Sequence, residues 1–272
     1  MTTLNLIGAG RVGRTLATVW ARHGVFEIQD VLTSSLTSAQ EACAAIGAGT
    51  AVATLQAMRP ADVWMVAVQD ARIADVAHAL AATQASGATG PIVFHCSGAQ
   101  NAGSLQPLAE LGWRTASAHC ILSFANVAAA VQQFAGTACA LEGEATACAV
   151  LEPAFQTIGG QCFRVAAEDK VLYHAAAVFA TNFLPVLQSV AEAAWTRTGV
   201  PTHLLPQLRA NLLRNAVDNI TRLGPAGALT GPAARGDVAA IERQAVVVQT
   251  WDAPSGDAYR ALSTLALRLA GH

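Results

Sequence analysis

The chain has 272 residues and a mass of 27.9 kDa, a length that suits two modest domains. Its 16 basic and 18 acidic residues give a net charge of −2, and this balance excludes a protein that binds nucleic acid through the phosphates. With 53% apolar and only 12% charged residues, the chain is not mainly disordered, and its scarcity of charge predicts a large subunit interface.

Apolar runs alternate with helical periodicity through the first part of the chain. Strands are predicted at 3–7, 28–32, 63–68, 91–96, 114–119, 137–141 and 161–165, and helices at 11–23, 37–46, 73–82, 105–111 and 146–158. The uninterrupted apolar run at 63–68 is typical of a strand buried on both faces of a parallel sheet. Alternation at this spacing predicts right-handed βαβ units and a mostly parallel sheet.

The strand pattern ends after residue 165. Long helical periodicities follow at 168–199, 206–223, 237–251 and 255–269. We therefore predict an α/β Rossmann domain that binds a dinucleotide over residues 1–165, and an all-α C-terminal domain over residues 166–272.

Several features bear on the location of the protein. Residues 171–191 carry no charge over a length that suits a membrane span, but their polar side chains favour a helix buried in protein, so no membrane partner is expected. The N-terminus lacks the basic segment of a signal peptide, and the six cysteines form no C-x-x-C pair. We expect reduced, buried cysteines, no metal site and a cytoplasmic protein.

A glycine-rich loop follows the first predicted strand and opens the first helix. It reads Gly8-Ala9-Gly10-Arg11-Val12-Gly13, which is the G-x-G-x-x-G pattern of dinucleotide binding. The first glycine permits a tight turn, the second lets the backbone approach a pyrophosphate, and the third lets helix and strand pack closely. The helix N-terminus would then bind the phosphates through its free N–H groups and dipole. The alternative is a tight turn with no ligand.

The end of the second strand bears on the choice of dinucleotide. An NAD site usually has an acidic residue there, on the ribose hydroxyls. Here the strand is followed by Thr33, Ser34 and Ser35, while Asp30 lies inside the strand and comes too early. These hydroxyls, together with Arg11, can hold a 2′-phosphate, so we predict NADP(H) rather than NAD(H). The alternative for Arg11 is a solvated cation at the start of a helix.

Further candidates follow the next two strands, because ligands of open parallel sheets bind beyond the carboxyl ends of the strands. Val68 is a candidate cofactor contact at the first of these ends, whereas Asp70 just after it is expected to cap the next helix. Ser97 and Gly98 follow the second of these strands, and their turn can lie beneath the nicotinamide.

Two histidines occur at adjacent strand ends. His95 and His119 are expected to point into one crevice, and Ser123 in the loop after His119 is a candidate substrate contact. His119 is either a ligand or proton carrier, or a histidine that is hydrogen-bonded to a loop carbonyl. The sequence leaves both interpretations open.

The helical half contributes its own polar groups. Lys170 and His174 are four residues apart and share one helix face, with Asn182 two turns further on. Hydride transfer to C=O or C=N needs a cationic or proton-donating group beside the heteroatom. Lys170 or His174 can supply it, and Asn182 can hold the substrate. The alternative is an ordinary amphipathic helix whose first cation, Lys170, lies in water.

A Gly-Pro turn interrupts the helices near residue 231. Asp237 is expected to cap the helix that follows. Arg235 either forms a fork for a substrate carboxylate or phosphate, or ties this loop to the sheet domain.

These segments resemble a known family. The matching blocks are the loop 8–13, His95-Cys-Ser-Gly-Ala99, residues 119–124, residues 170–182 and residues 228–237, in the expected order. They resemble Rossmann-like oxidoreductases with a helical C-terminal domain like that of 6-phosphogluconate dehydrogenase, relatives of pyrroline-carboxylate reductase and deazaflavin-dependent NADP reductase. The resemblance implies NADP(H) binding and a homodimer formed through the helical domains. Cys120 stands where the group commonly has proline, and Ser34 where it often has arginine.

Together these observations predict an NADP-dependent oxidoreductase that transfers a hydride between nicotinamide and a small, anionic C=O or C=N substrate. A dinucleotide-binding sensor without turnover is the alternative, and a reductase of a flavin-like carrier is a third. The sequence does not decide which of His119, Lys170 and His174 handles the proton.

Overall fold

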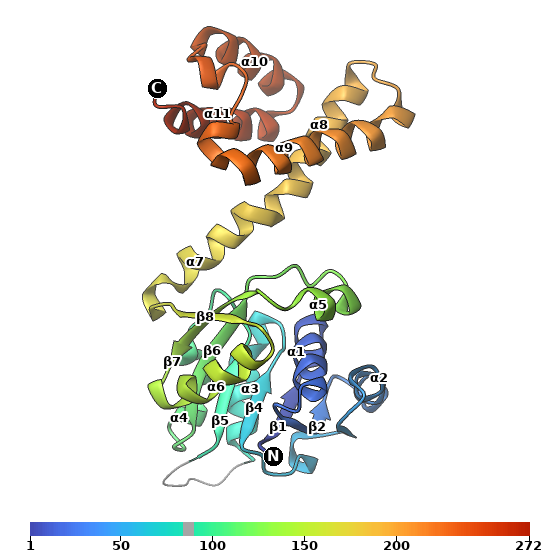
Figure 1. Cartoon of the computed structure of the whole chain (residues 1–272), viewed down its shortest axis with the longest axis vertical. Helices are drawn as coiled ribbons and strands as arrows, with labels where there is room; N and C mark the ends of the chain where they lie inside the picture. The colour runs from blue at the N-terminus through green and yellow to red at the C-terminus, as the bar shows by residue number, and fades with distance from the viewer. Residues whose placement is uncertain (84–89) are drawn as a thin grey trace. The chain divides into compact units, whose positions relative to one another are not determined.

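The computed structural model describes residues 1–83 and 90–272, which form two compact units, residues 1–179 and 180–272. The first unit is built on an eight-stranded sheet, and the second is helical (Figure 1). The predicted class, an α/β domain followed by an all-α domain, is confirmed. The last strand ends at Arg164, but the first compact unit continues to residue 179, so it also contains the first helix of the helical half.

The sheet has the strand order β3-β2-β1-β4-β5-β6-β7-β8. Every neighbouring pair is parallel except β6 and β7, which are antiparallel. The strands are β1 (Thr3–Ile7), β2 (Glu27–Leu32), β3 (Thr50–Val52), β4 (Val63–Val66), β5 (Ile92–His95), β6 (Arg114–Cys120), β7 (Ala138–Gly143) and β8 (Gln161–Arg164). Only the three-residue strand β3 lacks a counterpart among the predicted strands, because so short a run has no recognisable period.

The helices of the first unit follow the predicted order with two differences. They are α1 (Arg11–Arg22), α2 (Leu36–Ile46), α3 (Ile73–Ala81), α4 (Gln106–Ala109), α5 (Val127–Gln133), α6 (Ala145–Thr157) and α7 (Lys170–Ala177). Helix α4 is shorter than predicted and follows a 3₁₀ turn, Ala102–Leu105. Helix α5 was not predicted; Asn126 caps it by accepting a hydrogen bond from the Ala129 N–H at 3.0 Å.

Apolar side chains from alternate strand positions form a core on each face of the sheet. One core includes Leu4 and Leu6 of β1 with residues of α1 and α6, and Trp20 lies fully buried at its centre. The Trp20 indole donates a hydrogen bond to the Ala154 carbonyl at 3.0 Å, which ties α1 to α6. The other core includes Trp64 with residues of α3 and α4. Both faces of the central strands are therefore apolar, as the predicted parallel sheet requires.

The strand order reverses between β1 and β4. The chain runs from β1 outward to β2 and β3, then crosses to β4 on the other side of β1 and continues to β8 (Figure 1). A reversal of this kind leaves a crevice beyond the carboxyl ends of the two strands, where ligands of open α/β sheets bind.

The second unit consists of helices, as expected. They are α8 (Phe183–Arg197), α9 (Leu205–Ala228), α10 (Val238–Trp251) and α11 (Ala253–Leu269). The predicted single helix over 168–199 is interrupted by a π-helix at Val178–Asn182, and α9 breaks at Gly224, where φ is +72°. Asp237 accepts a hydrogen bond from the Ala240 N–H at 3.0 Å and caps α10, as predicted.

The long apolar helical segment is buried at Lys170 but not along its apolar stretch. Residues 167–197 are long and apolar enough by length and composition to cross a membrane, with a mean hydropathy of 1.3 over the test window. None of that window is buried within the described chain, so the prediction of a helix buried in protein is wrong for a single copy.

Candidate functional site

The glycine loop has the geometry that its sequence predicts. Gly8 has φ +86°, and a Cβ at this position would lie 2.7 Å from the Ala67 carbonyl oxygen. A Cβ at Gly13 would lie 2.7 Å from the Gly8 carbonyl oxygen, so only glycine lets α1 pack this closely on the loop. A Cβ at Gly10 would meet nothing within 4 Å of described structure. Gly10 is therefore not needed for packing, and its bare backbone borders open space.

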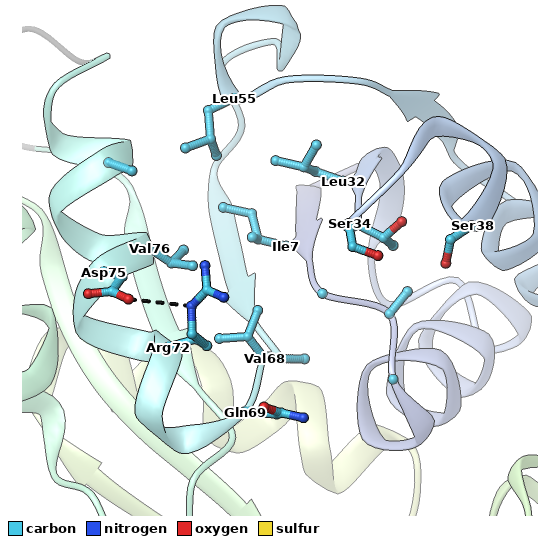
Figure 2. Close-up of a pocket in the computed structure, with 16 residues that line it drawn as sticks. Ile7, Leu32, Ser34, Ser38, Leu55, Val68, Gln69, Arg72, Asp75 and Val76 are labelled. Atoms are coloured by element: carbon cyan, nitrogen blue, oxygen red, sulfur yellow. Dashed lines mark ion pairs between the residues drawn. The ribbon is translucent and has the colours of Figure 1, made fainter.

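That open space is a cavity of about 740 Å³ at the strand-order reversal (Figure 2). The loops after β1, β2 and β4 form its walls, and helix α3 forms one side. Six of the predicted cofactor contacts line it: Gly8, Ala9, Gly10, Thr33, Ser34 and Val68. The other predicted contacts, Arg11, Val12, Gly13, Ser35, Ser97 and Gly98, do not line the cavity.

The N-terminus of α1 begins at this cavity. Gly10 is the N-cap residue, and among the described residues no side chain caps the first turn. The free N–H groups and the helix dipole favour an anion at that position. Arg14 donates from Nε to the Ala9 carbonyl at 2.8 Å, which holds the loop from behind. Arg11 is exposed on the first turn and Val12 packs against the core.

Hydroxyl groups form the rim of the cavity beyond β2. Ser34 is exposed and, with Thr33 and Ser38, lines the cavity. Thr33 donates its hydroxyl to the Ser35 carbonyl at 2.9 Å. Ser35 caps helix α2 by accepting from the Ser38 N–H at 3.2 Å, so its hydroxyl already has a structural partner.

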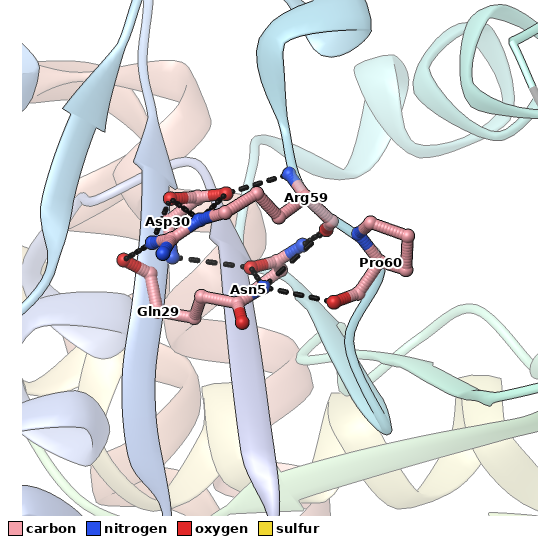
Figure 3. Close-up of polar contacts among 5 residues, drawn as sticks. All are labelled: Asn5, Gln29, Asp30, Arg59 and Pro60. Carbon is pink, nitrogen blue, oxygen red and sulfur yellow. Dashed lines mark hydrogen bonds and ion pairs between the residues drawn. The ribbon is translucent and has the colours of Figure 1, made fainter.

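Asp30 does not face the cavity. Its side chain is only 1% exposed and forms an ion pair with Arg59, with 2.6 Å between Nη2 and Oδ1 (Figure 3). The Arg59 N–H also donates to Oδ2 at 2.7 Å, and Asn5 accepts from the Asp30 N–H. This agrees with the inference that Asp30 comes too early to bind a ribose.

Sequence reasoning missed the far wall of the cavity. Leu55 and Val76 supply apolar surface there, and Arg72 pairs with Asp75 at 3.3 Å across one turn (Figure 2). Both charged side chains are largely exposed. Their position after the β4 strand end was the available signal, since that end was already expected to border the ligand.

A second polar cluster lies at the ends of β4, β5 and β6. The Ser97 hydroxyl donates to Asp70 Oδ2 at 2.6 Å and accepts from the N–H groups of Ala99 and Gln100. Asp70 was expected to cap a helix; it opens a 3₁₀ turn, Asp70–Arg72, and its carboxylate binds Ser97. Ser97 is 5% exposed, so its side chain orders this turn.

Lys170 anchors helix α7 to the same cluster. It is only 1% exposed, so the alternative of a solvated Lys170 is wrong. Its Nζ donates to the Ser97 carbonyl at 2.9 Å and to the Ser117 hydroxyl at 2.8 Å. Ser117 in turn donates to Glu142 Oε2 at 2.9 Å, and the same oxygen accepts from the Ala102 N–H. Burial lowers the pKa of Lys170, while the Glu142 and Asp70 carboxylates act against that shift.

One sequence signal for this group was available. Lys170 is the single lysine of the chain, and every other basic residue among the 16 is arginine. Arginine resists deprotonation, whereas the compact lysine ammonium has three donors and shifts its pKa readily when it is buried.

His119 and His174 lie beside Gly98, and Tyr173 of the same helix α7 contacts His119. His119 Nδ1 lies 2.9 Å from the Tyr173 hydroxyl, and the ring centroids of His119 and His174 are 5.5 Å apart. A Cβ on Gly98 would overlap with His174 Nδ1 and would lie 2.9 Å from His119 Nε2. His174 Nδ1 is buried and has no hydrogen-bond partner among the described residues. Tyr173 was missed, although it lies between two candidates.

His95 does not join His119 in a crevice, so that expectation is wrong. It is fully buried, its Nδ1 accepts from the Ser97 N–H at 3.2 Å, and its Nε2 donates to the Asn101 carbonyl at 3.0 Å. His95 is therefore the histidine that is bonded to a loop carbonyl. Burial lowers its pKa.

The three predicted substrate contacts lie far apart in the sequence, in the loop after β6, the π-helix and the turn before α10. Ser123 is exposed in the loop after β6. Asn182 ends the π-helix in the second unit, and its Oδ1 accepts from the Thr181 hydroxyl at 2.9 Å. Arg235 ends a 3₁₀ turn, Ala233–Arg235, and is exposed; no ion pair of the described chain uses it.

The class of protein follows from this fold and this loop. A mostly parallel sheet with a reversal at β1 and β4, and a G-x-G-x-x-G turn opening α1, define a Rossmann-like domain. Residues 2–120 match the model of the Rossmann-like domain, and residues 137–266 match the domain of unknown function DUF2520. The chain therefore combines a Rossmann-like domain with a DUF2520 domain, in agreement with the resemblance.

Solved structures share this fold across both units. Protein TM1727 from Thermotoga maritima is 24% identical, with a TM-score of 0.77 over 99% of this chain and 98% of that one. Protein BF3122 from Bacteroides fragilis, provisionally named an NADP oxidoreductase, is 22% identical, with a TM-score of 0.72 and 98% of each chain covered. A reductive aminase from Aspergillus terreus, solved with NADPH and ethyl-5-oxohexanoate, is 17% identical and has a TM-score of 0.62. The match covers 100% of this chain and 92% of the aminase. No curated protein matches the sequence.

The burial of Lys170 predicts a chemical footprint. An amine-acetylating reagent should modify the α-amino group of the folded chain, because Met1 is 79% exposed, and should spare Lys170. Both amines should react once concentrated guanidinium chloride unfolds the protein. Peptide mass spectrometry distinguishes the two sites, and acetylation of both at similar rates in the native protein would contradict the buried cage.

The histidine pKa values predict how stability responds to acid. Burial, then His174 and Lys170, lower the pKa of His119 to about 4. Burial also lowers the pKa of His95. The unfolded chain binds protons near pH 6.5 and the folded chain does not, so stability should fall as pH drops from about 6.5 to 4. Urea unfolding at several pH values measures this. The His119→Asn variant should show a shallower decline, and an unchanged slope would refute the assignment to His119.

Proposed function

We propose that the protein is an NADP-dependent oxidoreductase that transfers a hydride between nicotinamide and a small substrate with a C=O or C=N bond. The observation that carries this proposal is the cavity at the strand-order reversal, bordered by the bare backbone of Gly10 and the uncapped start of α1. The bare glycine backbone at Gly10, beside free N–H groups, lets a pyrophosphate approach closely. The named oxidoreductases that share the fold support the same reading.

The reaction class follows from the cofactor and from the second polar cluster. Reduced nicotinamide supplies a hydride to carbon, the π electron pair moves to oxygen or nitrogen, and that atom takes a proton. The groups able to hold a heteroatom or a proton lie at the next strand ends, where His119 stands beside Gly98 and α7. Lys170 orders the Ser97 turn beneath them.

Preference for the 2′-phosphate rests on the rim beyond β2. No carboxylate is available there, because Arg59 and backbone groups hold Asp30 inside the sheet. The nearby polar groups are the hydroxyls of Ser34 and Ser38, which donate hydrogen bonds to a phosphate without repelling it.

Titration with NADPH and NADH, followed by nicotinamide fluorescence, tests this proposal. NADPH should bind more tightly. In Gly10→Ala the added methyl group meets no described atom within 4 Å, so the fold should survive while NADPH binding is lost or strongly weakened.

The matched controls are thermal melting of Gly10→Ala and binding by Asn215→Asp, which alters α9 in the second unit. Gly10→Ala should melt near the wild type and Asn215→Asp should bind NADPH normally. Tighter binding of NADH would refute the rim argument, and binding of neither nucleotide would refute the oxidoreductase proposal.

The anionic character of the substrate rests on Arg235. Its guanidinium is exposed and takes part in no ion pair of the described chain, so its donors are available to a carboxylate or phosphate.

The proposed cytoplasmic location is supported by the six cysteines, all of which are free thiols.

The proposed partner is a second copy of the chain. Helices α8 and α9 expose large apolar side chains at 41–56% of their surface, namely Val186, Leu187, Leu212, Val217, Ile220 and Leu223. The chain has only 12% charged residues with which to keep such a face in water. A homodimer that buries these helices would cover it.

Light scattering after gel filtration should give twice the 27.9 kDa chain mass. Ile220→Asp places a charge in the exposed apolar face and should shift the protein towards the monomer. Asn215→Asp adds the same charge at a polar position of α9 and should remain dimeric. A monomeric wild type, or recovery of the protein in membranes, would contradict the proposed homodimer.

A further inference from the structure

The contact between His119 of β6 and Tyr173 of α7 indicates a separate role for each residue. We propose that His119 donates the hydrogen bond from Nε2 to the substrate heteroatom, and that Tyr173 is the positioning residue that holds the proton of His119 on Nε2. This inference rests on the proposed oxidoreductase function and deepens it. It separates His119 from Lys170 and His174, which the sequence left as equal candidates.

The contact between the two side chains decides the tautomer. The Tyr173 hydroxyl lies 2.9 Å from His119 Nδ1, and the two rings meet edge-on at 89° with centroids 5.5 Å apart. A phenol is a stronger donor than a neutral imidazole N–H, and an imidazole nitrogen is a stronger acceptor than a phenol oxygen. The favoured bond therefore runs from the Tyr173 O–H to Nδ1, which leaves the ring proton of His119 on Nε2.

The phenol stays a donor. Burial, followed by the nearby thiols of Cys120 and Cys139, raises the pKa of Tyr173, so the hydroxyl keeps its proton at neutral pH. His119 remains neutral, because burial, His174 and Lys170 together outweigh the opposing effect of Asp70. A neutral imidazole fixed as Nε2–H can polarise a carbonyl without first losing a proton to solvent.

The other nitrogen of His119 is available. Among the described residues Nε2 has no hydrogen-bond partner, and its neighbour is Gly98, where a Cβ would come within 2.9 Å. Contacts connect this point to the cofactor cavity: Gln69 lines the cavity, and Asp70 beside it binds Ser97, which precedes Gly98. The Nε2–H group therefore lies one strand end beyond the proposed nicotinamide site.

Lys170 and His174 are less suited to contact a substrate. Lys170 Nζ is buried and already donates to the Ser97 carbonyl and the Ser117 hydroxyl. His174 presents its Nδ1 to Gly98, where it is buried without a partner. Lys170 and His174 therefore contact the turn of Ser97 and Gly98, beside which His119 lies.

Long-range proton–nitrogen NMR of histidine-labelled protein tests the tautomer directly. In the wild type, His119, assigned with a His119→Asn variant, should be predominantly Nε2–H at pH 7.5. Tyr173→Phe should turn it into a mixture of tautomers. Tyr259→Phe is the matched control, because it removes the chain's other tyrosine hydroxyl, which bonds to Gln244 in the second unit. A wild-type Nδ1–H tautomer, or no change in Tyr173→Phe, would overturn the proposal.

Modification by diethyl pyrocarbonate tests the accessibility of Nε2. Histidine peptides are followed by mass spectrometry, with exposed His78 and fully buried His95 as internal references. His119 should react in the free protein, and saturating NADPH should slow its modification several-fold without affecting His78. An unreactive His119, or one that bound NADPH leaves unprotected, would overturn its place beside the cofactor.

The two proposals can fail separately. If NADPH does not bind the wild type, the oxidoreductase function fails, whatever tautomer NMR finds. If NADPH binds but the tautomer is not set by Tyr173, only this inference fails. With a carbonyl substrate in hand, His119→Ala should lower kcat by about a hundredfold, as loss of one preorganised donor does, while NADPH affinity stays unchanged.

Discussion

A buried ammonium group organises the polar half of this site. Lys170 Nζ donates to the Ser97 carbonyl and to the Ser117 hydroxyl, and Ser117 in turn donates to the Glu142 carboxylate. Burying an isolated charge costs several kcal/mol, and removing one member of such a network leaves the others unsatisfied. The helix that begins at Lys170 therefore has one stable position on the sheet. Tyr173 and His174, three and four residues further along, are placed against His119 and Gly98 as a consequence.

The alternation of a β-strand lets β6 serve both the core and the site. Ala116, Ala118 and Cys120 belong to the apolar core, so Ser117 and His119 face the opposite side together. Ser117 pairs with His95 in β5, where both ring nitrogens of the histidine are bonded. His119 lies beyond the pairing with β5, although it still pairs with Ala140 of β7, and only its Nδ1 has a partner among the described residues. Two histidines near adjacent strand ends thus have different surroundings, because β5 ends at the level of Ser117, two residues before His119.

On the cofactor side, the decisive feature is that the Asp30 carboxylate does not reach the rim of the cavity. Arg59 draws the Asp30 carboxylate into the sheet, and the rim that remains near the cavity offers hydroxyls. The loop of three glycines combines a positive φ, a close helix contact and an open backbone at separate positions. The proposed anion binding at the start of α1 and the proposed tolerance of a 2′-phosphate at the rim therefore rest on different residues, and each can be altered without the other.

The class of the fold, the glycine loop and most strands and helices could be predicted from the sequence, because periodicity and glycine chemistry are local properties. The sequence also indicated Lys170, His119 and His174, but as equal candidates. The burial of Lys170 in a cage, the bond of His95 to a loop and the contact of Tyr173 with His119 appear only in the folded chain. The contacts of Lys170 with Ser97 and of Tyr173 with His119 join residues 73 and 54 positions apart, which no local pattern records. Burial and pairing, which set the charge and the donor role of each group, are created when the strands align.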